Sequence, residues 1–299
     1  MSLTRTLSFL AILGSVLFSS ALHAAPPAVA TPAPPAAKPA AAPRHSAVIP
    51  EPRREAWWQL RHNSINHWAK RGPVELLFLG DSITQGWGKI IPPPKKKDSK
   101  DKVTADTPFE DFEGNASWKK HYASRKPLDA GIGGDQTQHV LWRIDHGLLD
   151  SIKPRVVVLM IGTNNSGDKG NTGEEIGEGV IAIIQKLRAK LPEAKILVLA
   201  IFPRGDDDPA YAKPTKGVVV TRARLGARNQ KLVTANAMIA KAADGKMVYF
   251  MDIGPKFLDK NGQLPRDIMY DYLHLTAKGY EIWAESIEEK VAELLGEKR

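Results

Sequence analysis

Short, mainly apolar runs separated by longer segments constrain the fold more than any other feature of this chain. Four such runs stand at Pro73–Leu79, Arg155–Ile161, Lys195–Ile201 and Met247–Asp252, and a shorter one stands at Leu128–Gly131. Their apolar character is continuous rather than alternating, which is typical of parallel strands covered on both faces. We therefore expect these runs to form a buried parallel sheet.

Segments with helical periodicity lie between and after the runs. Their apolar residues recur at steps of one, three or four: Val140, Leu141, Ile144 and Leu148; Ile176, Val180, Ile183, Ile184, Leu187 and Leu191; Tyr280, Trp283, Ile287, Val291 and Leu294. Thr276 is a suitable N-cap for the last of these helices. Strand–helix alternation predicts an α/β sandwich with right-handed crossovers. In such folds, ligands bind beyond the carboxyl ends of the strands.

The first fifty residues have a different composition. Met1–Ala25 has a positive start at Arg5, a short apolar core and small residues near its end, which is typical of a secretory signal peptide. An uncleaved anchor is the alternative. Residues 26–50 include eight Pro and nine Ala, so we expect an extended, unpacked linker. The remaining 249 residues, 51–299, are long enough for one domain with a substantial core.

Cysteine is absent from the sequence, which excludes disulfides, Cys-based zinc sites, iron–sulfur clusters and a cysteine nucleophile. The formal net charge is +9. We interpret this excess as scattered, solvated charge, because the basic run Lys95–Lys102 has no aromatic residues interleaved for nucleic-acid binding. No nucleic-acid partner is therefore expected.

Polar residues directly follow the first predicted strand. Gly80-Asp81-Ser82 places a serine hydroxyl where a strand gives way to a helix, and a helix N-terminus stabilises a nearby anion. Taken alone, this tripeptide is more typical of a turn and helix cap than of a nucleophile.

Two further strand ends carry groups that can donate hydrogen bonds. Gly131–Asp135 follows the short apolar run, and its glycines let a backbone N–H approach a ligand closely. Asn164 follows the run that ends at Ile161, and its amide can donate toward the same crevice. The glycine segment matches neither a P-loop nor a G-x-G-x-x-G motif.

Asp271 and His274 stand three residues apart near the C-terminus. This spacing predicts that both side chains share one side of a helical turn, where the carboxylate would fix the imidazole tautomer. Together with Ser82 and the two donor segments, they supply a nucleophile, a base, an orienting acid and oxyanion donors. No metal or other cofactor is needed for such acyl chemistry, and His139 and His146 lack a carboxylate cluster that would complete a metal site.

This arrangement resembles the SGNH (GDSL-type) hydrolase family, whose four blocks fall on Ser82, Gly134, Asn164 and His274. The branch of platelet-activating-factor acetylhydrolase catalytic subunits is similar at five segments: residues 131–135, 138–143, 162–165, 203–205 and 269–275. The resemblance covers roughly Val74–Leu295. It implies a flavodoxin-like three-layer α/β/α sandwich with a five-stranded parallel sheet in the order 2-1-3-4-5.

The resemblance also implies residue roles. Ser82 attacks an ester carbonyl, His274 acts as base and then acid, and Asp271 orients His274. The backbone N–H groups of Ser82 and Gly134 and the amide of Asn164 face the oxyanion. The acyl group is expected to be short, acetyl above all.

Two features depart from that branch. The signal and tether indicate export to the periplasm or the cell exterior, and the segment Lys89–Asn115 reads as an insertion that forms either a rim beside the nucleophile or a solvated loop. Export makes O-acetylated carbohydrate a reasonable substrate, and no stable membrane span is expected after signal cleavage. The oligomeric state stays open, a homodimer included.

The substrate pocket is expected to involve Ile83 and Leu273, which are next to Ser82 and His274 in the chain. Trp87 either faces a sugar or alcohol group or packs in the core. A secreted esterase is the first interpretation. An acyltransferase of the same fold and a non-catalytic binding module are the alternatives, which product analysis with an acceptor sugar and fluorophosphonate labelling of Ser82 would separate.

Overall fold

The computed structural model describes residues 44–87, 113–212 and 219–297. The predicted signal peptide, most of the predicted linker, the Lys95–Lys102 run and most of the Lys89–Asn115 insertion lie outside these residues. Within the described part of the chain, no helix combines the length and the apolar character needed to cross a membrane.

A five-stranded parallel sheet forms the centre of the fold. Its strands are β1 (Leu76–Gly80), β2 (Pro127–Asp129), β3 (Val156–Met160), β4 (Lys195–Leu199) and β6 (Val248–Met251), in the order β2-β1-β3-β4-β6. All neighbouring pairs are parallel. This confirms the five strands expected from the apolar runs and the 2-1-3-4-5 order that the resemblance implies. Every residue of β1 and β3 is buried, as continuous apolar runs require.

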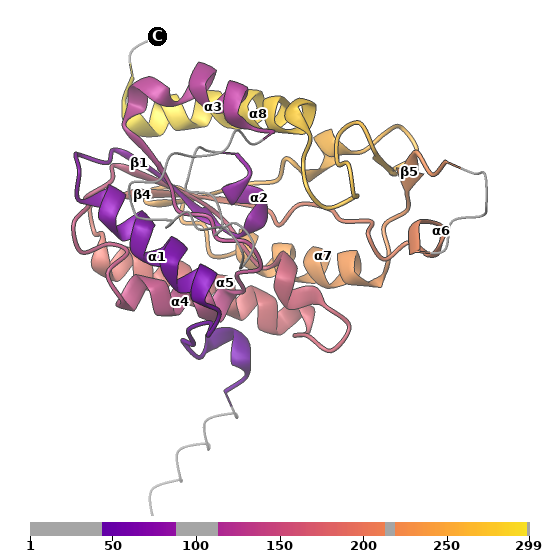
Figure 1. Ribbon diagram of the computed structural model, residues 1–299, viewed down its shortest axis with the longest axis horizontal. Coiled ribbons are helices and arrows are strands. Elements are labelled where there is room, and N and C mark those ends of the chain that lie inside the picture. The colour runs from indigo at the N-terminus through magenta and orange to yellow at the C-terminus, as the bar shows by residue number, and fades with distance from the viewer. Residues whose placement is uncertain (1–43, 88–112, 213–218, 298–299) are drawn as a thin grey trace, which may run out of the picture. The chain divides into compact units, whose positions relative to one another are not determined.

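Helices cover both faces of the sheet, which gives the three-layer sandwich (Figure 1). One face carries α1 (Ala56–Ala69), α4 (Thr137–Asp145), α5 (Gly173–Lys190) and α7 (Ala227–Ala240), and the other carries α3 (Asn115–His121) and α8 (Ala277–Leu295). Side-chain caps set two of the predicted helix starts. The Thr172 hydroxyl accepts from the backbone N–H of Glu175, and that of Thr276 accepts from Gly279.

Shorter elements complete the described chain. They are the helices α2 (Ser82–Gln85) and α6 (Pro209–Ala212), the 3-10 turns η1 (Ser46–Val48), η2 (Ala123–Arg125), η3 (Thr163–Ser166) and η4 (Gly254–Phe257), and the antiparallel pair β5 (Arg222–Ala223) and β7 (Leu264–Pro265). Strands of two residues leave no apolar run in the sequence, so the β5–β7 pair was not expected.

The folded unit begins earlier than the predicted boundary at Glu51. It spans Pro43–Arg299, and η1 packs against α4 and α5. Ala47 is fully buried, and its carbonyl accepts a hydrogen bond of 2.8 Å from the Thr137 hydroxyl. The linker predicted over residues 26–50 is therefore wrong at its C-terminal end, because these last residues find apolar and polar partners on two helices.

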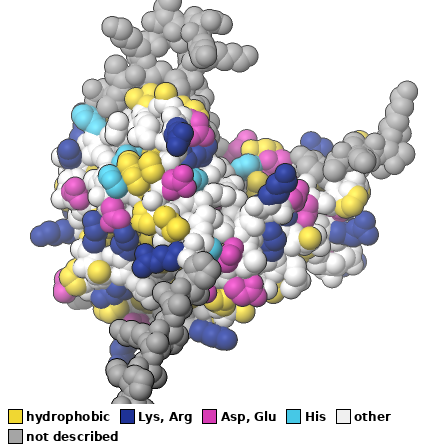
Figure 2. Space-filling view, turned by 90° about the horizontal axis from the view of Figure 1, so that it is seen from below, with side chains coloured by type: hydrophobic (Ala, Val, Ile, Leu, Met, Phe, Trp, Pro, Cys, Tyr) yellow, Lys and Arg dark blue, Asp and Glu magenta, His cyan; other side chains and the backbone are white. Residues whose placement is uncertain are grey.

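Charged side chains of both signs are interspersed on the face viewed from below the sheet (Figure 2). Ion pairs on the described surface include Lys186 with Asp145, and Arg53 with Glu55. This mixture agrees with the interpretation of the positive charge as scattered over the surface.

Candidate active site

The candidate nucleophile stands directly beyond the carboxyl end of β1. Asp81 is the N-cap of α2, and its Oδ1 accepts the backbone N–H of Ile83 at 3.0 Å. This cap fixes the turn between the strand and the short helix, so that Ser82 occupies the first helical position and remains only half-buried. The predicted strand-to-helix placement of Ser82 is therefore what the structure shows.

Three side chains from distant segments form a continuous hydrogen-bonded chain. Ser82 Oγ lies 2.9 Å from His274 Nε2, and His274 Nδ1 lies 2.7 Å from Asp271 Oδ2. With Nδ1 protonated and donating to the carboxylate, Nε2 is left as an acceptor for the serine hydroxyl proton. This arrangement can withdraw a proton from Ser82 as its oxygen attacks an electrophile.

The Asp271–His274 pair is held by a tight loop rather than by the helical turn expected from the spacing. Asp271 Oδ1 accepts the backbone N–H groups of Leu273 at 3.1 Å and His274 at 2.7 Å. Between them Tyr272 adopts a left-handed backbone conformation, with φ of 61°. The expectation of a helical turn was wrong because an aspartate side chain closes a turn by itself through backbone N–H groups.

The hydrogen-bonded carboxylate of Asp271 makes His274 a stronger base than an isolated imidazole. Burial by itself lowers the pKa of His274, but the hydrogen bond and charge of Asp271 outweigh burial, so the pKa is raised above its usual 6.5. Burial raises the pKa of Asp271, and hydrogen bonds from the ring and backbone of His274 more than reverse this, so that Asp271 stays ionised.

Asp81, which directly precedes Ser82 in the chain, is a second carboxyl group near the nucleophile. It is fully buried, and burial raises its pKa to about 7, although the Ile83 N–H and the charge of His274 act in the opposite direction. Its Oδ2 has no hydrogen-bond partner among the described residues.

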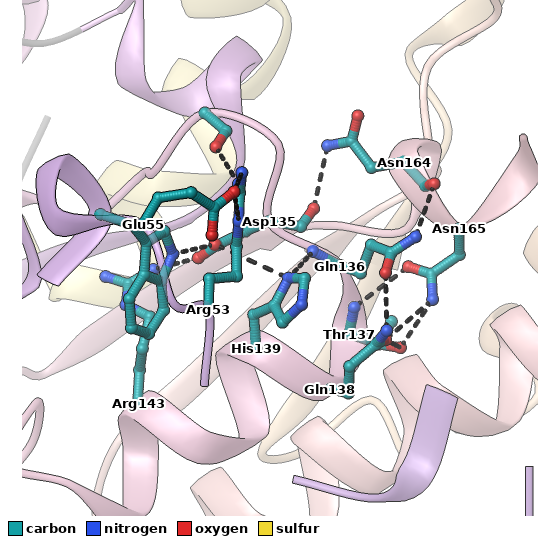
Figure 3. Close-up of polar contacts among 12 residues, drawn as sticks. Arg53, Glu55, Asp135, Gln136, Thr137, Gln138, His139, Arg143, Asn164 and Asn165 are labelled. Carbon is teal, nitrogen blue, oxygen red and sulfur yellow. Dashed lines mark hydrogen bonds and ion pairs between the residues drawn. The ribbon is translucent and has the colours of Figure 1, made fainter. Parts of the chain in front are cut away.

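The two further donor segments contact each other. Asn164 Nδ2 donates to the backbone carbonyl of Asp135 at 2.9 Å, and Gln136 Nε2 donates to the backbone carbonyl of Asn164 at 2.9 Å (Figure 3). These bonds join the loop after β2 to the loop after β3. An amide nitrogen carries two N–H groups, so one N–H of Asn164 remains for a ligand.

Gly134 requires the backbone freedom of glycine. Its φ is +76°, in the left-handed region, and its N–H takes part in no hydrogen bond with the described residues. Two buried contacts at Asp135 hold the loop in place. Arg143 Nη1 forms an ion pair of 2.9 Å with Asp135 Oδ2, and the indole N–H of Trp58 donates to Asp135 Oδ1 at 2.6 Å. Burial raises the pKa of Asp135 to about 6 even beside Arg143.

A pocket of about 230 Å³ opens at Ser82 and His274. Its lining consists of Ser82, Gln85, Gly86, Glu113, Gly133, Tyr270, His274, Leu275 and Tyr280. Gly134 and Asn164 are not in this lining, although their loop neighbour Gly133 is. Larger hollows lie elsewhere, away from these side chains.

Tyr270 stands at the rim of the pocket. Its ring stacks on that of His274, with centroids 6.0 Å apart, and the residue is 47% exposed. Sequence reasoning missed it as a lining residue, along with Gln85. The only signal was that Tyr270 lies within the motif that carries Asp271 and His274.

The three pocket residues expected from the sequence do not line the pocket. Trp87 is fully buried, and its ring centroid lies 4.2 Å from that of Trp283 on α8. Ile83 is 1% exposed, and Leu273 packs partly buried against the core. Those expectations were wrong because neighbours in a turn or helix point their side chains in different directions, and these three point toward the core. For Trp87, the core alternative holds.

No cluster of three or more His, Cys, Asp or Glu side chains that could hold a metal ion occurs in residues 44–87, 113–212 and 219–297.

Comparison with known proteins identifies the family. The sequence profile of the GDSL-like Lipase/Acylhydrolase family matches residues 78–282, a span that contains Ser82, Gly134, Asn164, Asp271 and His274. The chain belongs to this family. Among curated relatives of this GDSL-like hydrolase, platelet-activating factor acetylhydrolase IB subunit alpha2 of Rattus norvegicus is 32% identical over 240 residues, covering 80% of this chain and 86% of the relative. Subunit alpha1 of Homo sapiens is 30% identical over 225 residues, covering 75% and 78%.

Solved structures share the fold of the GDSL-like hydrolase. A GDSL-like lipase from Bacteroides thetaiotaomicron matches with a TM-score of 0.55 at 19% identity, covering 78% of this chain and 96% of that one. A carbohydrate acetylesterase from Sinorhizobium meliloti matches with a TM-score of 0.50 at 20% identity, covering 74% and 99%. The family and its relatives make this chain a carboxylic-ester hydrolase with a small-molecule ester as substrate.

Proposed function

We propose that this GDSL-like hydrolase is an exported serine esterase that removes acetyl or other short acyl groups through a Ser82–His274–Asp271 triad. The observation that carries the proposal is the unbroken chain from Ser82 Oγ to His274 at 2.9 Å and from His274 to Asp271 at 2.7 Å, at the mouth of a small pocket. Such a chain activates an otherwise weak hydroxyl nucleophile.

The first step is acyl transfer to the enzyme. Ser82 Oγ attacks the ester carbonyl carbon while His274 Nε2 takes the hydroxyl proton, and the carbonyl oxygen becomes an oxyanion. Collapse of this tetrahedral intermediate breaks the bond to the alcohol, and His274 returns the proton to the leaving oxygen. Asp271 stays ionised and stabilises the imidazolium that forms between these transfers.

The oxyanion is stabilised by the N–H groups of Ser82 and Gly134 and the free N–H of Asn164. These donors are held before the substrate arrives, because α2 fixes Ser82 and the Asn164–Asp135 hydrogen bond fixes the two loops. Donors that need no rearrangement stabilise developing charge most effectively. In the second step, water attacks the acyl carbon while His274 Nε2 takes its proton. The bond to Ser82 Oγ then breaks, His274 returns the proton to that oxygen, and the carboxylic acid leaves, with the same N–H groups stabilising the oxyanion.

The size of the pocket favours a short acyl group. At about 230 Å³ it is smaller than the roughly 300–1,000 Å³ typical of pockets for drug-sized ligands. Each methylene that does not fit a pocket of this kind costs ~1–3 kcal/mol of selectivity. The names of the curated relatives, which are acetylhydrolases, agree with this size.

An O-acetylated carbohydrate is the proposed natural ester. The signal-like Met1–Ala25 and the Pro/Ala-rich stretch after it support export, which would bring the enzyme to cell-surface or environmental glycans. The name of the carbohydrate acetylesterase from Sinorhizobium meliloti points in the same direction, although its likeness to this chain concerns the fold.

A panel of 4-nitrophenyl esters from acetate to decanoate, together with acetylated xylan and acetylated amino sugars, tests this proposal. The matched control is the S82A variant. We expect the highest kcat/KM for acetate, a steep fall with acyl length, and no turnover by S82A above background. A preference for decanoate would contradict the short-acyl assignment. Acetyl transfer to an added acceptor sugar in place of release to water would identify the chain as a transferase.

A further inference from the structure

The peptide bond between Gly133 and Gly134 has a charged partner. Arg53 Nη1 donates a hydrogen bond of 2.7 Å to the carbonyl oxygen of Gly133, across 80 positions of sequence. That carbonyl belongs to the same planar peptide unit as the N–H of Gly134, which the proposed function assigns to the oxyanion. Arg53 therefore contacts the opposite end of a group that donates to the reacting oxygen.

Arg53 is itself fixed in place. Its Nη2 donates to Glu55 Oε1 at 2.6 Å (Figure 3), and its guanidinium carbon lies 4.9 Å from the centroid of the Trp57 ring. The side chain of Arg53 is only 18% exposed. A planar guanidinium can donate hydrogen bonds to a carboxylate and to a carbonyl at the same time while it stacks on an aromatic ring.

The glycine loop is complementary to this guanidinium. A side chain at Gly134 would place its Cβ 2.5 Å from Arg53 Nη1, so the guanidinium occupies the space that glycine leaves open. On the other side, the N–H of Gly133 donates to Gln85 Oε1 on α2 at 2.7 Å. The loop is thus held between the nucleophile helix and a cation from the N-terminal segment.

We propose that Arg53 is a positioning residue of the oxyanion hole, a role that rests on the proposed function. A charge-assisted hydrogen bond to a peptide carbonyl increases the polarisation of that peptide and strengthens its N–H as a donor. The same bond fixes the direction of the Gly134 N–H before the substrate binds. Because the hydrogen bond from the Gly134 N–H to the substrate oxygen gains strength as the oxyanion forms, Arg53 lowers the barrier more than it aids substrate binding.

The test compares R53M, which keeps an unbranched but shorter side chain without the charge, with R54M as the matched control. Arg54 is the exposed neighbour, so R54M removes the same charge one residue away. With 4-nitrophenyl acetate, we expect R53M to lower kcat about tenfold with KM within about twofold of the wild type, because a bond to a charged group is being lost. R54M should match the wild type in both constants.

Thermal melting of each variant separates this role from a purely structural one. R53K serves as a second variant if R53M does not fold, because lysine keeps the positive charge but lacks the several N–H donors of the planar guanidinium. The kcat of R53K should fall between those of R53M and the wild type. A wild-type kcat in either folded Arg53 variant overturns the proposal. So does a rise in KM at constant kcat, or an equal loss in R54M. A wild-type protein without Ser82-dependent hydrolysis would instead overturn the proposed function itself.

Discussion

Ser82 Oγ and His274 Nε2 lie 2.9 Å apart although 192 positions of sequence separate them. Ser82 follows the strand β1, and His274 stands in the loop before α8. The contact is possible because parallel strands end at one edge of the sheet and the last loop returns to that edge. The reactivity of this protein should therefore follow the protonation and orientation of one imidazole.

The pH dependence of the reaction should report His274. Nε2 accepts a proton only from the neutral ring, and Asp271 raises the pKa of that ring above its usual 6.5. Activity should accordingly be full at alkaline pH and should fall as the pH drops through a value above 6.5. A profile of kcat/KM for 4-nitrophenyl acetate measures this directly. Activity that stayed constant down to pH 5 would argue against His274 as the base.

The D271N variant should change both the rate and the pH profile. Loss of the carboxylate removes the group that raises the pKa of His274 and leaves the effect of burial, so the acid limb should move to lower pH. The rate should fall on the order of 10³–10⁴, less than in S82A, because the carboxylate orients rather than reacts. Steady-state kinetics across pH checks both effects. An unchanged acid limb would mean that Asp271 does not control His274.

The N164A variant should lose on the order of 10²–10³ in kcat, the usual cost of removing one side-chain oxyanion donor. KM should change little, because the donor acts on charge that develops in the transition state. Since Asn164 also donates to Asp135, thermal melting must show that the variant is folded. A folded N164A with the wild-type kcat would remove Asn164 from the oxyanion hole.

Trp87 should matter for stability and not for specificity. It is fully buried against Phe78, Tyr280 and Trp283, so W87A should lower the free energy of unfolding by ~3–5 kcal/mol. The ranking of acyl lengths should stay that of the wild type. Urea unfolding and the 4-nitrophenyl ester panel measure the two properties. An altered acyl ranking with unchanged stability would return Trp87 to the substrate pocket.

The sequence was sufficient to predict the strands of the sheet, because strands buried on both faces must be apolar at nearly every position. The sequence also predicted where the polar residues at the strand ends lie, since the position of each is set by the strand that precedes it. It was misleading for Trp87 and Ile83, because proximity to Ser82 along the chain says nothing about which way a side chain points. Burial reveals that direction only once the helices are packed.

Arg53 shows a different limit of sequence reasoning. Neither its neighbours nor its spacing reveals a hydrogen bond to a carbonyl 80 positions away. The turn around Asp271 shows a third limit, because the pairing with His274 was expected but the local backbone was not. Two conformations, a helical turn and an aspartate-closed loop, bring residues three apart together, and the surrounding packing selects between them.

Covalent labelling of Ser82 by a fluorophosphonate tests the central claim most directly. The reagent reacts with a serine hydroxyl that a neighbouring base has activated, and peptide mapping by mass spectrometry locates the adduct. We predict one adduct, on the peptide that contains Ser82, with loss of esterase activity in proportion to labelling and no adduct in S82A. Labelling at another residue, or an active enzyme that leaves Ser82 unmodified, would contradict the account.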